Sequence, residues 1–288
     1  MSLNDKNFIQ KAFDITKENI ILAQPLIIFM IVLSFTLAGL SMQANRAAYM
    51  IFAVANILLC TAFFAGWFYM IKQGIYLDKR VQNGEYKKAE ERAAASMALG
   101  KEFFPGVGEY FLPVTMTLAV YTIVFLGIIF LFYKIGLNIL PHPHIDLNKF
   151  AEAVNSPPAE MQKYVYSLSI EQLRALNLWM LYAGSVFCAV SFLTMFWFPA
   201  IFDKKTEKQE FFLLVPFLSF KRNLVFLFKN FLGSVGIMIF LFVLNTVLSV
   251  LSVIFNLNII LAIAGLIISF YFMTYALVLI FLYYEERK

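Results

Sequence analysis

Long apolar runs, separated by shorter polar stretches, dominate the chain. A helix needs about 20 apolar residues, at about 1.5 Å rise each, to cross about 30 Å of hydrocarbon. Four runs have this length. A fifth, about 231–284, is long enough for two helices, and we divide it at Asn256-Leu257-Asn258 because Asn favours turns and helix ends. The pattern predicts an all-α polytopic membrane bundle of six transmembrane helices, forming a single integral membrane domain over 1–288. The expected spans are about 20–42, 47–71, 110–133, 176–202, 231–255 and 259–284.

The polar connections predict three outward hairpins of two spans each. Each hairpin follows a polar lead-in, and these begin near Ala12, Ala98 and Ser219. The second helix of the first two hairpins ends similarly, in Gly66-Trp67-Phe68 and Phe196-Trp197-Phe198. Two interpretations stay open: a three-fold repeat, or the common appearance of any helix that enters a membrane.

The lead-ins are typical of amphipathic helices that lie on the inner leaflet. In the first, Phe8, Ile9, Ala12 and Phe13 share one face at helical spacing. The segment Pro105-Gly106-Val107-Gly108 is expected to break the chain before the third span.

One long connection, about 135–175, is expected to form a helical cap on the outer side. Asp146 starts a short helix there, and Ser169-Ile170-Glu171-Gln172 is a capping-box pattern that starts the fourth span.

Composition agrees with a membrane location. Hydrophobic residues make up 61% of the chain and charged residues 14%, whereas soluble domains average about 45–50% and about 25%. These values exclude an ordinary cytosolic enzyme, a secreted disulfide scaffold and a disordered chain.

The distribution of positive charge predicts the topology. Of the 23 Lys and Arg residues, 18 fall on the side of the two termini and the long linkers. Cytoplasmic loops of membrane proteins carry such an excess. We therefore expect both termini in the cytoplasm and a retained first span, and we interpret the net charge of +5 as a topology signal rather than a nucleic-acid site.

Motifs for catalysis are absent from the sequence. No charged residue lies at a span centre, and neither G-x-x-x-x-G-K-[ST] nor G-x-S-x-G occurs. Cys60 and Cys188 lie in apolar runs and are expected to be buried hydrophobes. His142 and His144 share one side of an extended Pro-His-Pro-His segment, which either rigidifies the loop or holds a metal. We expect no cofactor, no metal and no catalytic residue.

Neutral polar residues are the remaining candidates within the spans. Gln24, Asn56 and Asn245 either hydrogen-bond between helices or line a polar cleft for a lipid headgroup or small solute. Pro25, Pro113 and Pro199 lie near the inner ends of spans, where each can free a backbone carbonyl.

Three short segments resemble a group of uncharacterised bacterial six-helix membrane proteins, which includes the membrane domain of some glycerophosphodiester phosphodiesterases. They are the segment 199–203, the lead-in Ser219-Phe220-Lys221-Arg222-Asn223 and the tail Leu282-Tyr283-Tyr284-Glu285-Glu286-Arg287. The resemblance implies a bacterial inner-membrane location and no assigned catalytic residue. The phosphodiesterase barrel is absent from this chain, so that activity does not carry over.

Three functions are therefore weighed. The chain transports or flips a lipid or small molecule; it is a non-catalytic scaffold or accessory subunit, with a protein partner at the basic cytoplasmic linkers; or it is an intramembrane enzyme that uses Glu109 or Asp203. The first is favoured. The bilayer is the partner common to all three.

Overall fold

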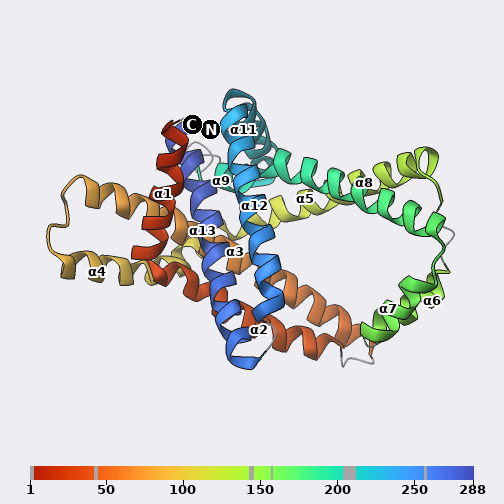
Figure 1. Cartoon of the computed structure of the whole chain (residues 1–288). Helices are drawn as coiled ribbons and strands as arrows, with labels where there is room; N and C mark the ends of the chain where they lie inside the picture. Colours follow the sequence, from red (N-terminus) through yellow and green to blue (C-terminus); the bar gives the residue numbers. More distant parts are fainter. Residues whose placement is uncertain (1–2, 42–44, 143–145, 157, 204–211, 256–257) are drawn as a thin grey trace. The chain divides into compact units, whose positions relative to one another are not determined.

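The computed structural model describes residues 3–41, 45–142, 146–156, 158–203, 212–255 and 258–288, and every regular element in them is a helix (Figure 1). The predicted all-helical character is confirmed, and six helices are long and apolar enough to cross a membrane, as a multi-pass membrane protein requires. They are Ile20–Leu40, Arg46–Gln82, Ala89–Ile139, Ile170–Ile201, Phe231–Phe255 and Ile259–Arg287. The predicted division at Asn256-Leu257 and the end of the first span at Met42 lie outside the described residues.

The helices are bounded as follows. They are α1 (Leu3–Glu18), η1 (Ile20–Ala23), α2 (Gln24–Ser41), α3 (Arg46–Gln82), α4 (Ala89–Ala98), η2 (Leu99–Glu102), α5 (Phe103–Ile139), α6 (Leu147–Asn155), α7 (Pro158–Ser167), α8 (Ile170–Thr194), α9 (Trp197–Ile201), η3 (Phe212–Leu214), α11 (Val215–Lys229), α12 (Phe231–Phe255) and α13 (Ile259–Arg287).

The chain divides into two compact units. The first comprises 1–120 and 193–288, and the second comprises 121–192. In the first unit α1, α3, α9 and α12 all pack against α13, while α2 packs against α3. The large buried side chains gather near the C-terminal end of α13, whereas α12 and the N-terminal halves of α3 and α13 carry many exposed apolar side chains.

Helix α1 packs on protein with its apolar face. Ala12 and Ile15 are fully buried, in line with the contact of α1 with α13. Ile9 and Phe13 line a groove together with residues of α12 and α13 such as Phe240. Helix α1 therefore has an apolar face, as predicted, and Ala12 on that face is covered by other helices.

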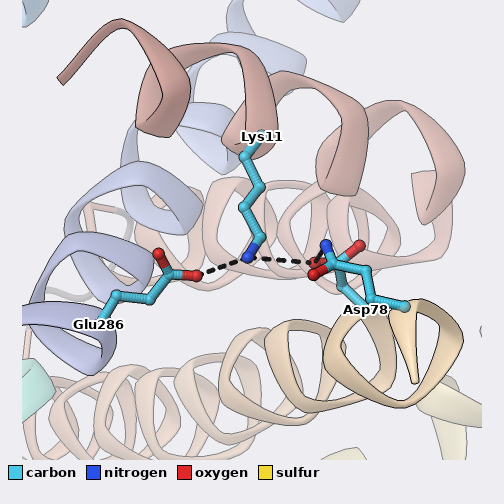
Figure 2. Close-up of polar contacts among 4 residues, drawn as sticks. Lys11, Asp78 and Glu286 are labelled. Carbon is cyan, nitrogen blue, oxygen red and sulfur yellow. Dashed lines mark hydrogen bonds and ion pairs between the residues drawn. The ribbon is translucent and has the colours of Figure 1, made fainter. Parts of the chain in front are cut away.

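An ion bridge ties α1 to two other helices at the same end (Figure 2). The Lys11 Nζ lies 2.5 Å from the Glu286 Oε1 of α13 and 3.8 Å from the Asp78 Oδ2 of α3. Gln82 donates a hydrogen bond to the same Asp78 carboxylate, at 2.8 Å. One cation thus links three helices that are far apart in sequence.

The structure corrects one predicted break and shows one helix that continues beyond its predicted span. Helix α3 continues past position 71 to Gln82, which makes it about 55 Å long at 1.5 Å per residue. The expected break at 105–108 does not occur, because α5 begins at Phe103 and places Pro105 in its first turn, where a helix needs no amide donor. A Cβ on Gly106 would lie 2.5 Å from the Tyr69 Cβ, so the glycine permits close packing of α5 on α3.

The second unit contains the predicted cap. Asp146 caps α6 by accepting from the amides of Asn148 and Lys149, as expected. The capping box at Ser169 and Gln172 is also present, with side chain–backbone bonds of 3.0 and 3.2 Å. Trp179 donates to the Pro141 carbonyl at 3.1 Å, which joins α8 to the end of α5.

Candidate functional site

Helices α9, α11 and α13, which carry or adjoin the segments 199–203, 219–223 and 282–287, pack together in the first unit. The ring of Phe196 lies 4.7 Å from that of Phe226 and 5.8 Å from that of Tyr283, while Phe202 lies 6.0 Å from Phe281. Lys288 pairs with Asp203 at 3.5 Å. These contacts form an aromatic core from α9, α11 and the end of α13.

Asn223 of α11 closes a break in the fourth span. Pro199 has no amide hydrogen and its ring crowds the carbonyl four residues earlier, so α8 ends at Thr194 and α9 begins at Trp197. Asn223 accepts from the Phe196 amide at 3.0 Å and donates to the Leu193 carbonyl at 2.6 Å. The broken backbone thereby regains partners without water.

Trp197 fixes the start of α11 in the same region. Its Nε1 donates to the Pro216 carbonyl at 3.0 Å and to the Ser219 hydroxyl at 3.1 Å. The lead-in residues Ser219 and Asn223 are both fully buried. Their role in the structure is to hold the kinked end of the fourth span.

A cleft of about 830 Å³ opens beside this core, and we call it the Tyr110 cleft. Its floor consists of buried side chains from three helices, Tyr110, Ile201 and Val215. Its rim carries more exposed side chains, Glu109, Leu112 and Phe212. The cleft therefore combines an apolar floor with a carboxylate at the rim, where the third span begins.

Lys72 lies behind the floor of the cleft. It is only 3% exposed, and its Nζ lies 5.9 Å from the ring centre of Tyr110 and 5.8 Å from that of Tyr76. Lys72 lies one position beyond the predicted second span, 47–71. The signal that identifies its burial is the helical spacing from Phe68 through Lys72 to Ile75, which puts it on the buried face of a helix that continues to Gln82.

The ring of Tyr110 is held on two sides by other aromatic residues. Phe202 lies 4.3 Å away and Tyr69 5.5 Å away, by ring centres. Together with Lys72, these contacts fix the floor of the cleft before any ligand enters.

Gln24, Asn56 and Asn245 are not gathered into one cleft. Asn56 is buried between α2 and α3, where it accepts from the Thr36 hydroxyl at 2.6 Å and donates to the Phe52 carbonyl at 2.8 Å. Asn245 is exposed on α12. Gln24 lines a separate, mostly apolar crevice of about 370 Å³ with Pro25, Phe29 and Phe63. Gln24 and Thr36 are twelve positions apart on α2, or about 18 Å at 1.5 Å per residue.

The two acids considered for catalysis have different surroundings. Glu109 lines the Tyr110 cleft, whereas Asp203 is buried and paired with Lys288. His144 lies outside the described residues, so the His142 and His144 pair stays a prediction. Within the described residues, no group of three or more His, Cys, Asp or Glu side chains is placed to hold a metal ion.

No family model, curated protein or solved structure matches the chain. The fold and the cleft are therefore the observations on which a function can be argued.

Proposed function

We propose that this chain is an integral membrane protein that binds a lipid or small amphipathic molecule in the Tyr110 cleft and moves it across the membrane. The observation that best supports this proposal is the cleft itself, whose apolar floor and acidic rim lie where the third span begins. An amphipathic ligand presents apolar and polar parts side by side, and such a lining matches both.

The prolines support this proposal. Pro113 lies inside α5 at the cleft, and Pro199 lies in α9 beside the floor residue Ile201. Interruptions of spanning helices at a binding cavity are typical of transporters, and the interruption between α8 and α9 lies near the floor residue Ile201. The predicted three-hairpin repeat, with each hairpin led by its own polar segment, belongs to the same proposal.

We also propose that the protein belongs to the bacterial six-helix group, in the inner membrane, with both termini in the cytoplasm. Packing of α9 against both α11 and α13, the helices that carry or adjoin the three resembling segments, supports membership. The Lys11–Glu286 pair brings the two end helices to one side, as an even number of spans requires. No catalytic activity is part of the proposal. Reporter fusions at position 288 and within the 158–167 helix test the orientation, since the two sites should report opposite compartments.

The binding step is tested by filling the cleft. Val215 is a buried floor residue, and Val225 is 60% exposed on the same helix. We expect Val215→Trp to reduce both lipid retention, measured by native mass spectrometry, and transfer of a labelled lipid between leaflets of proteoliposomes. Val225→Trp should leave both unchanged, and equal behaviour of the two variants would contradict the proposal.

A scaffold role is the second candidate function, and α4 favours it. None of the ten residues of α4 is buried. The helix follows a turn at Gly84, and its first turn carries the charged residues Glu90 and Glu91. An exposed helix beside basic connections suits a protein partner or anionic lipid. Affinity purification from native membranes tests this role: a stoichiometric partner lost on deletion of 85–98 would favour it over transport.

A further inference from the structure

We propose that the Tyr110 cleft selects an amphipathic molecule whose headgroup carries a primary ammonium group. This inference rests on the proposed function, because it assigns the ligand class of the same cleft. The chemistry of the lining residues supports it.

Glu109 supplies the hydrogen-bond acceptors that matter for this assignment. Glu109 is the one charged residue among the described residues that line the cleft, and its side chain is exposed at the rim. Four residues later, Pro113 lacks the amide that would bond to the Glu109 carbonyl in a regular helix. Glu109 thus carries a carboxylate at the rim, and its carbonyl lacks the amide donor of a regular helix.

A primary ammonium group matches these acceptors. It carries a positive charge and three N–H donors, so it can bind a carboxylate and a carbonyl together. The aromatic rings of Tyr110, Phe111 and Phe212 also line the cleft. Aromatic faces attract ammonium groups and accept alkyl chains, so the same walls suit both parts of such a ligand.

Among the described lining residues, an anionic headgroup finds no comparable match. No Lys, Arg or His is among the described residues that line the cleft. The nearby cation Lys72 is buried, and it faces the rings of Tyr76 and Tyr110. The negative group at the rim therefore disfavours a ligand with a net negative headgroup.

The test compares two headgroups with identical acyl chains. Full-length protein is titrated in detergent with short-chain phosphatidylethanolamine and, separately, with short-chain phosphatidylglycerol, and each dissociation constant is measured. We expect phosphatidylethanolamine to bind about tenfold more tightly, the ratio that about 1.4 kcal/mol gives. Glu109→Gln, which keeps the side-chain shape, should bring the ratio close to one.

Glu102→Gln is the matched control, since Glu102 lies one short helix earlier and does not line the cleft. It should keep the tenfold preference, and thermal unfolding of all three proteins verifies that each is folded. Equal or tighter binding of phosphatidylglycerol by the wild type, or an unchanged ratio in Glu109→Gln, would overturn the ammonium assignment alone. Binding of neither lipid, or binding that Val215→Trp does not weaken, would overturn the proposed cleft function and this inference with it.

Discussion

The carboxamide of Asn223 takes the place of helical backbone partners at Phe196. Its oxygen accepts from the Phe196 amide, and its nitrogen donates to the Leu193 carbonyl. A kink at the end of the fourth span is thus stabilised by a side chain from a helix some 30 positions later. The floor residue Ile201 lies five positions after Phe196, at the end of α9, so this contact also helps to position the floor of the Tyr110 cleft.

Replacement of Asn223 by Leu is expected to destabilise the protein by about 2–4 kcal/mol, since it leaves a buried amide and a buried carbonyl without partners. Denaturant unfolding in detergent micelles measures the change. Asn230→Leu is the control, because Asn230 lies at the end of the same helix and, within the described residues, its side chain bonds to the Phe226 carbonyl of that helix. Equal losses in the two variants would show that the bridge across the break has no special role.

Close packing of α5 on α3 predicts a contrast between two neighbouring glycines. A Cβ at Gly106 would meet the Tyr69 Cβ at 2.5 Å, whereas a Cβ at Gly108 meets no atom within 4 Å. Gly106→Ala should lower stability by about 1–3 kcal/mol through overpacking. Gly108→Ala should be neutral or slightly stabilising, because alanine favours helix. Thermal unfolding of both variants measures the two changes in stability. A larger loss of stability in Gly108→Ala than in Gly106→Ala would contradict the close packing of α5 on α3.

The Lys11 bridge predicts a modest effect that depends on salt. Lys11→Met removes the cation between Asp78 and Glu286, and we expect a loss of about 1 kcal/mol because the pair is partly exposed. The loss should shrink at high salt, where charges are screened. Lys163→Met is the control, since the Lys163–Glu160 pair lies on an exposed surface. A loss that stays constant between low and high salt would attribute the effect to packing instead.

The polar residues of the spans are expected to differ in cost according to their contacts. Asn56→Leu breaks the bond to Thr36 and should cost about 0.6 kcal/mol, the average for such bonds in membranes. Asn245→Leu, on an exposed surface, should cost nothing measurable. Neither change should alter lipid transfer in proteoliposomes. A transport defect in both would restore the polar cleft of Gln24, Asn56 and Asn245 as the site.

Much of the fold is predictable because its signals are local. Runs of about 20 apolar residues identify the spans, and the capping residues Asp146 and Ser169 mark helix starts by contacts within four residues. The first turn of α5 was mispredicted because Pro and Gly usually break helices, yet Pro is tolerated where no amide is needed.

The site is less predictable because its contacts are distant in sequence. Asn223 meets Leu193 thirty positions earlier, and Lys72 meets Tyr110 across two helices. Polarity alone selected Gln24, Asn56 and Asn245, but a residue's type does not tell which helix it will face. Pro113 was the local clue to the cleft, since it marked the position where a carbonyl loses its helical partner.

Blocking the mouth of the Tyr110 cleft tests the central claim most directly. Leu112 is a rim residue, 50% exposed, and Met97 is 74% exposed on α4 away from the cleft. In a background without Cys60 and Cys188, Leu112→Cys and Met97→Cys are reconstituted, labelled with a bulky maleimide, and assayed for leaflet-to-leaflet transfer of a labelled aminophospholipid. We predict that labelling abolishes transfer in the Leu112→Cys protein and leaves it intact in the Met97→Cys protein. Undiminished transfer after complete labelling of Leu112→Cys would contradict the account.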